Sequence, residues 1–278
     1  MNLHLSADGL GDTICGVYAA AGIARHAPVT YWAKHPDWLG RISAPGVTIA
    51  RHDERPGDSL DMNLGYGEQL RDSVSRKDWY VQQVMAQTGL VDLEASAGFH
   101  VDRRQLVLPE LLQDKPPYVV LAPYSLWESR NWTEAGWAHV VTHLHRAGYE
   151  VLGLHTDEAR LRRTFGSRIN LLWGLSAPEV VDTLLGAAGV IGLDSGITHV
   201  AGMLGVPTVA VMAHLSVRLV FSHTAVQAVG SNACGYAPCG WQVDRGFSEA
   251  CGLHGCHSLA STSASDVAAA LLKLLPRR

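Results

Sequence analysis

The sequence lacks the features that mark nucleic-acid-binding, membrane-spanning and fibrous proteins. No dense basic run precedes the terminal Arg277 and Arg278, and 22 Lys and Arg against 26 Asp and Glu give a net charge of −4. This balance argues against a nucleic-acid or acidic-membrane partner. No apolar stretch approaches the roughly 18 residues of a transmembrane helix, and no solenoid repeat is present. A composition of 47% hydrophobic and 17% charged residues indicates a globular protein.

Cysteine is scarce and unevenly placed, and the meaning of its clustering depends on the redox compartment. The segment from Met1 to Asp8 has no basic or apolar stretch of signal-peptide type, so we expect a cytoplasmic protein. In a reducing compartment, clustered cysteines suggest a metal before they suggest disulfides. Paired short spacings of four thiolates suit a structural Zn or Fe site, because four thiolates leave no open position for catalysis. Buried free cysteines or two disulfides are the alternatives. The four residues are Cys234, Cys239, Cys251 and Cys256.

The order of expected elements predicts an α/β fold. In the second half, short apolar runs alternate with helix-like segments, which is typical of a parallel, doubly wound sheet. The prolines of the segment 113–117 cannot continue a helix, so a domain boundary is predicted there, with domains 1–115 and 118–278. Expected strands are 3–5, 29–32, 47–50, 118–122, 150–154, 189–193 and 208–212, and expected helices include 78–90, 133–147, 157–165, 177–186, 197–204 and 266–275.

The first motif that could carry chemistry is Gly9-Leu10-Gly11-Asp12-Thr13. Its two glycines allow a sharp turn and close approach to a ligand, and the following helix start offers unpaired N–H groups to an anion. It is not the full dinucleotide fingerprint, because Ile14 stands where a third glycine is needed. Asp12 is either a helix N-cap or a general base that takes a proton from an acceptor hydroxyl.

The second motif runs from Gly192 to Pro207. A buried strand ends at Leu193, and the turn Asp194-Ser195-Gly196 leads into a helix with Thr198 and His199 in its first turn. Backbone N–H groups, two hydroxyls and an imidazole then converge at the positive end of the helix dipole, which describes a diphosphate site. The alternative is a capped helix with a core histidine.

Taken in order, three segments resemble glycosyltransferase family 9, the ADP-heptose:lipopolysaccharide heptosyltransferases. They are the Gly-Leu-Gly-Asp turn, the segment Trp127–Trp137, and Asp-Ser-Gly-Ile-Thr-His-Val-Ala from Asp194. The resemblance implies a GT-B fold, in which two Rossmann-like domains face each other across a cleft. It also implies a nucleotide-sugar donor held by the C-terminal domain and an acceptor approached from the N-terminal domain, which is shorter here.

By this resemblance Asp12 matches the proposed catalytic base, and Arg130 falls where the family has a basic residue that neutralises phosphate. An Arg would do so as a bidentate fork, or it is an ordinary surface residue. Asp157 and Glu158 fall where the family has acidic residues, one of which contacts the donor ribose, and we select Glu158, although both carboxylates could instead complement the helix dipole. The full set of expected donor-binding residues is Gly9, Gly11, Thr13, Glu158, Asp194, Ser195, Gly196, Thr198 and His199.

Two departures from the family pattern concern the expected site. The family's His-Pro-Gly after the first strand of the second domain is replaced by Ala-Pro-Tyr-Ser at residues 122–125. The basic residue that commonly precedes the first Gly-rich turn is replaced by Ala7 and Asp8, and an extra carboxylate would repel an anionic acceptor.

The resulting hypothesis is an inverting, metal-independent transfer of a sugar, such as heptose, from an ADP-linked donor to a glycan or protein hydroxyl. Asp12 would be the base, and Arg130 with the start of the helix at Ser195–His199 would stabilise the departing diphosphate. Two alternatives come from other classes: a catalytically silent GT-B-like protein that binds a nucleotide sugar or a protein, and a nicotinamide-dependent Rossmann enzyme.

Overall fold

The computed structural model describes the chain except residues 66–67, 70–71, 114–116, 128–129, 214, 222, 232, 235–238, 240–255 and 277–278. It divides into two compact units. The first unit comprises Met1–Gln105 and Arg218–Ser222, and the second comprises Leu106–Val217 and His223–Arg278. Across the described ranges, no helix combines the length and apolarity needed to cross a membrane.

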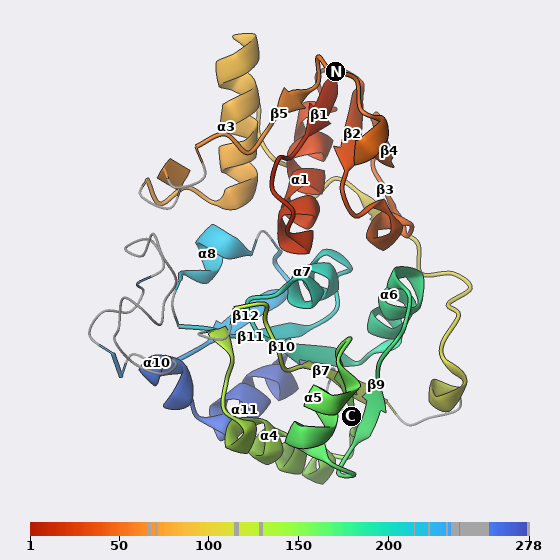
Figure 1. Ribbon diagram of the computed structural model, residues 1–278, viewed down its shortest axis with the longest axis vertical. Helices are drawn as coiled ribbons and strands as arrows, with labels where there is room; N and C mark the ends of the chain where they lie inside the picture. The colour runs from red at the N-terminus through yellow and green to blue at the C-terminus, as the bar shows by residue number, and fades with distance from the viewer. Residues whose placement is uncertain are drawn as a thin grey trace. The chain divides into compact units, whose positions relative to one another are not determined.

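The first unit is built on a four-stranded sheet in the order β4-β2-β1-β5, with all neighbours parallel. Helix α1 follows β1 directly and lies beside α3 (Figure 1). A small antiparallel pair, β3 and β6, completes the described strands of this unit. The bounds are β1 Asn2–His4, α1 Leu10–Ile23, β2 Val29–Ala33, η1 Pro36–Leu39, β3 Ile42–Ser43, β4 Val47–Arg51, η2 His52–Glu54, β5 Leu60–Asp61, α3 Arg76–Thr88 and β6 His100–Val101.

The second unit holds a six-stranded sheet in the order β12-β11-β10-β7-β8-β9, again with all neighbours parallel. Its strand order reverses between β7 and β10, which is where open α/β sheets bind ligands. The bounds are η3 Glu110–Leu112, β7 Tyr118–Ala122, α4 Glu134–Arg146, β8 Glu150–Leu154, α5 Glu158–Phe165, β9 Asn170–Leu172, α6 Ala177–Gly186, β10 Gly189–Gly192, α7 Gly196–Met203, β11 Thr208–Val211, β12 Val226–Val229, α10 His257–Ala260 and α11 Ala264–Leu274. Helix α8, Val217–Val220, lies where the chain returns to the first unit.

The central strands of the second unit are buried in its core, which explains why they are almost wholly apolar. Every residue of β7, β10 and β11 is buried, as expected for a parallel sheet covered on both faces. Helices α4 and α11 pack against each other below this sheet (Figure 1). Trp137 on α4 is 1% exposed. Ser263 caps α11 by accepting a hydrogen bond from the Asp266 backbone N–H, at 3.3 Å. The predicted α/β class with parallel sheets is confirmed.

The division between the units differs from the boundary expected near residues 113–117. The contact division falls between Gln105 and Leu106. The reason is that Val107 and Leu108, which follow this division, pack against α6. The Val107 N–H donates to Asp182 Oδ2 at 2.8 Å, and the Leu108 side chain lies against Gly186. The chain also returns to the first unit at Arg218–Ser222, where the Val220 carbonyl accepts from the Cys15 thiol. A single boundary cannot represent that return.

Candidate functional site

The carboxylate of Asp12 is held by two donors from α3. Asp12 Oδ1 accepts from the Tyr80 hydroxyl at 2.8 Å and lies 3.1 Å from Arg76 Nη1. Helices α1 and α3 lie side by side in the first unit (Figure 1), which places these three side chains together. Gly9 is the N-cap of α1, so Asp12 lies in the first helical turn and is not the cap residue.

The surroundings of Asp12 keep it fixed and in contact with solvent. Burial, followed by the nearby Asp12 charge, raises the pKa of Tyr80 well above its ordinary value, so its hydroxyl stays protonated and donates. The Asp12 side chain retains 17% exposure, and the Arg76 side chain 10%. A Cβ at Gly9 would collide with Asp12 Oδ2, so the glycine makes room for this oxygen. Two donors thus orient one carboxylate oxygen, and the other lies over the Gly-rich turn.

Two other residues of the first motif serve the packing of α1. Thr13 is buried, and its carbonyl oxygen accepts a hydrogen bond from the Tyr31 hydroxyl at 3.1 Å. Gly11 is partly buried in the first turn. Thr13 therefore connects α1 to β2, a structural role that the motif alone did not indicate.

In the second unit, the loops after β7 and β10 meet at the reversal of strand order. Ala122 and Gly192, the last residues of these strands, are register partners. The Ser125 hydroxyl donates to the Asp194 carbonyl at 3.0 Å and joins the two loops. Arg130 Nη1 lies 3.0 Å from Asp194 Oδ2. The structure thus brings together two residues, Arg130 and Asp194, that the sequence placed in separate motifs.

The turn into α7 uses some of its polar side chains internally. The Thr198 hydroxyl donates to the Leu193 carbonyl at 2.6 Å, and Thr198 is fully buried. His199 is 2% exposed. Ser195 and Gly196 are the partly exposed residues at the helix start. Of the groups expected to bind an anion, the Ser195 hydroxyl and the backbone N–H groups at the helix start therefore belong to partly exposed residues, while Thr198 and His199 are buried inside the turn.

The acidic pair at the start of α5 has local partners. Asp157 is the N-cap and accepts from the Arg160 backbone N–H at 3.0 Å. Glu158 Oε1 lies 2.6 Å from both Nε and Nη2 of Arg162, one helical turn later. Glu158 therefore takes part in an exposed i,i+4 ion pair. A ribose contact by Glu158 stays a prediction.

Three of the four clustered cysteines lie in described residues, and Cys251 lies outside them. Cys234 and Cys256 are free, partly buried thiols, and Cys239 is buried. The Cys234 N–H donates to the Ser258 hydroxyl at 3.1 Å, and Cys256 is the N-cap of α10, the helix that carries Ser258. Helix α10 thus connects the first and last cysteines of the cluster. Among the residues whose placement is described, no group of three metal-ligating side chains is present.

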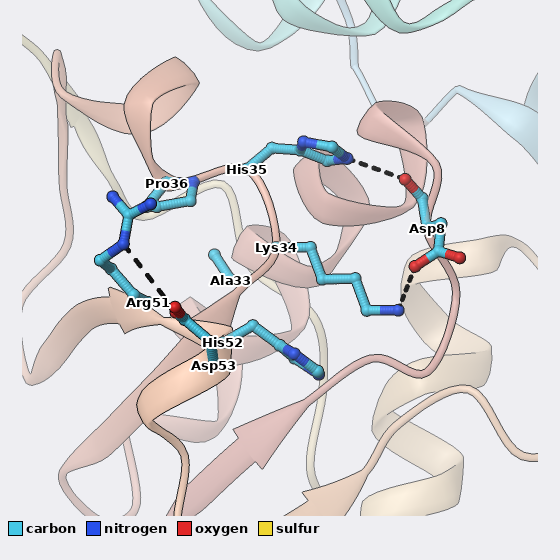
Figure 2. Close-up of a pocket in the computed structure, with 8 residues that line it drawn as sticks. All are labelled: Asp8, Ala33, Lys34, His35, Pro36, Arg51, His52 and Asp53. Carbon is cyan, nitrogen blue, oxygen red and sulfur yellow. Dashed lines mark hydrogen bonds and ion pairs between the residues drawn. The ribbon is translucent and has the colours of Figure 1, made fainter.

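A pocket of about 610 Å³ lies at the carboxyl ends of β2 and β4 in the first unit (Figure 2). Lys34 forms an ion pair with the Asp8 carboxylate, and His35 Nε2 lies 2.8 Å from the Asp8 carbonyl oxygen. Arg51 Nε lies 3.9 Å from Asp53 Oδ1. The Asp8 charge, expected to repel an anionic acceptor, is thus offset by Lys34 from the neighbouring strand. The residues around the pocket are Asp8, Ala33, Lys34, His35, Pro36, Arg51, His52 and Asp53.

Sequence comparison connects this geometry to known proteins. The model of glycosyltransferase family 9 (heptosyltransferase) matches residues 76–229, more than half of the chain. Lipopolysaccharide heptosyltransferase 1 of Pseudomonas aeruginosa is 28% identical over 135 residues, 46% of this chain and 37% of that protein. The autotransporter heptosyltransferase TibC of Escherichia coli is 31% identical over 117 residues, 39% of this chain and 28% of that protein. The matched segments therefore span less than two fifths of these relatives.

Structure comparison extends the likeness to nearly the whole chain. The crystal structure of the dodecameric iron-containing heptosyltransferase TibC in complex with ADP-D-beta-D-heptose matches 98% of this chain and 75% of that chain. The TM-score is 0.68 at 14% identity. At this identity the match concerns the fold, and it confirms the predicted GT-B class with two Rossmann-like units.

Two residues of the Asp12 site, Arg76 and Tyr80, were missed from the sequence. The helix was predicted to begin at Asp78, whereas α3 begins at Arg76 after the N-cap Ser75. The i,i+4 spacing of Arg76 and Tyr80 places them on one face of a helix, and the full extent of α3 would have revealed it.

Proposed function

The chain belongs to glycosyltransferase family 9, the heptosyltransferase family, and from that membership we propose that it transfers a sugar from an ADP-linked donor, such as ADP-heptose, to an acceptor hydroxyl. The observation that carries the proposal is the Asp12 carboxylate, which Tyr80 and Arg76 hold at Oδ1. A fixed and partly exposed carboxylate suits a general base.

The proposed reaction is a single displacement with inversion. Asp12 takes the proton of the acceptor hydroxyl as its oxygen attacks the anomeric carbon of the donor. The bond from that carbon to the diphosphate breaks, and the diphosphate leaves with the electron pair as ADP. The acceptor is a hydroxyl of a glycan or a protein. The cytoplasmic location expected from the sequence stays a prediction.

The diphosphate is proposed to bind at the second unit. The start of α7 offers backbone N–H groups at Ser195 and Gly196 where the helix dipole is positive. Arg130 adds a guanidinium that Asp194 holds in place. Positive groups fixed in advance stabilise charge on a leaving group without reorganising during the reaction.

The clustered cysteines are proposed to hold a structural iron or zinc ion outside the transfer chemistry. Helix α10 connects the segment of Cys234 to that of Cys256, and Cys239 lies between the two in the sequence. Four thiolates drawn together from these segments would bind iron or zinc and tie the segments to one another.

Metal analysis of the purified chain tests this site. We expect about one iron or zinc ion per chain. Cys234→Ser should lose the metal and unfold at lower temperature, because metal binding contributes to folding. Cys15→Ala is the matched control, since this cysteine packs in α1 of the first unit, and it should keep the metal. Metal-free wild-type protein with a normal melting curve would contradict the site.

A thermal-shift panel tests the proposed donor. A ligand at 100 times its dissociation constant adds about 2.7 kcal/mol of stability, which corresponds to about 5–10 °C for a protein of this size. We expect shifts with ADP and ADP-heptose and none with UDP, GDP or NAD. A shift with NAD alone would indicate the nicotinamide alternative. A shift with ADP-heptose but no transfer to any acceptor would indicate a silent binding protein.

A further inference from the structure

A second histidine is buried against the histidine of α7. His223 Nε2 lies 3.4 Å from His199 Nδ1, and the two rings meet edge to face with centroids 5.5 Å apart. His199 is 2% exposed and His223 6%. His223 lies 24 residues after His199, between α8 and β12, and belongs to no motif in the sequence.

The contact restricts the proton positions of both rings. A hydrogen bond between two ring nitrogens needs one N–H donor and one bare acceptor. On the far side of its ring, His199 Nε2 lies 4.0 Å from Asp194 Oδ1. A carboxylate that carries negative charge favours the N–H form of the nitrogen that faces it. His199 then carries its proton on Nε2, its Nδ1 is bare, and His223 must donate.

Two further observations support this order of protons. Burial, and then the neighbouring His199, hold the pKa of His223 well below its usual range, so the ring stays neutral. Asp194 is paired with Arg130 at 3.0 Å, which favours its ionised form. The four side chains therefore form a series of contacts, from Arg130 to Asp194, from Asp194 to His199, and from His199 to His223.

Helix α7 is shaped to receive the second ring. Gly202 lies one turn after His199, and a Cβ at Gly202 would approach His223 Cδ2 to 2.8 Å. The absence of a side chain at Gly202 lets His223 pack flush against the helix. This close fit holds its Nε2 toward His199, independently of the charges.

We propose that His223 is a positioning residue that donates its Nε2–H to His199, fixes the tautomer of His199 together with Asp194 at the other ring nitrogen, and thereby orients Asp194 and Arg130 beside the start of α7. The tautomer is inferred from the contacts of the two rings, and only its effect on sugar transfer rests on the proposed function. The tautomer of a histidine is set by the hydrogen bond of its other nitrogen. His223 plays that part here.

Nitrogen-15 NMR of histidine-labelled protein tests the tautomers directly, because donor and acceptor ring nitrogens have distinct shifts. We expect bare Nδ1 and protonated Nε2 on His199, and protonated Nε2 on His223. His223→Gln, whose amide still donates, should preserve the His199 pattern. His223→Leu should turn it into a mixture of tautomers. A wild-type His199 protonated on Nδ1, or an unchanged His199 in folded His223→Leu, would overturn the proposal.

Turnover supplies the second readout. His223→Leu should lower kcat about tenfold with little change in KM, as expected for the loss of one aligned hydrogen bond, and His223→Gln should restore it. If His223→Leu fails to fold, the wild-type spectrum decides the tautomers by itself. If the spectrum is as expected but the wild-type protein transfers no sugar, the proposed function fails and the tautomer assignment stands.

Discussion

Asp12→Asn is expected to lower sugar transfer about a hundredfold to ten-thousandfold, the range attributed to a positioned general base. The asparagine oxygen can still accept from Tyr80 and Arg76, which donate to Asp12 Oδ1 in the wild-type protein. An amide cannot take a proton from the acceptor hydroxyl. The fold and the second-unit donor contacts should stay, so the ADP-induced thermal shift should equal that of the wild type.

Tyr80→Phe is the matched control for Asp12. This variant keeps the carboxylate and its Arg76 contact but removes the donor at 2.8 Å. It should reduce kcat by about tenfold, the effect of one hydrogen bond to a charged group, and leave measurable turnover. Wild-type turnover by Asp12→Asn would remove Asp12 from the mechanism. A collapse of both variants to the same rate would show that position, and not proton transfer, limits the reaction.

Local sequence signals predicted the framework of the site well. The strands β7, β8, β10 and β11 are short apolar runs, and the turn after β10 is marked by Asp194, Ser195 and Gly196. The periodicity of apolar residues and the residue types that favour turns depend on neighbouring positions, so a single sequence shows them. Strand β12 was not predicted, because its four residues are at most partly buried and include an exposed glutamine.

Contacts between distant segments could not be predicted in this way. Tyr80 lies 68 residues from Asp12, and Lys34 lies 26 residues from Asp8. The missing basic residue before the Gly-rich turn is supplied in space by Lys34 at the end of β2. Which side chains meet across parallel strands depends on the sheet order β4-β2-β1-β5. That order differs from the order of the strands along the chain and cannot be deduced from one sequence.

The ion pair of Arg130 and Asp194 is expected to give the largest effect on stability. The Asp194 side chain is 7% exposed and the Arg130 side chain 21%. Breaking a fully buried pair costs about 3–5 kcal/mol. Because water partly reaches Arg130, we expect Arg130→Gln to lower the free energy of unfolding by about 2–3 kcal/mol, or about 5–10 °C in the melting temperature.

A double-mutant cycle separates this pairing from simple loss of packing. Asp194→Asn should cost less than Arg130→Gln, because the guanidinium left behind retains more contact with water than the carboxylate does. The double variant should be more stable than Arg130→Gln alone, since it leaves no buried carboxylate at this position. Additive losses in chemical unfolding would mean that the two side chains are not coupled. Arg130→Lys then separates charge from geometry: a point charge should keep part of the ADP shift, whereas Arg130→Gln should lose most of it.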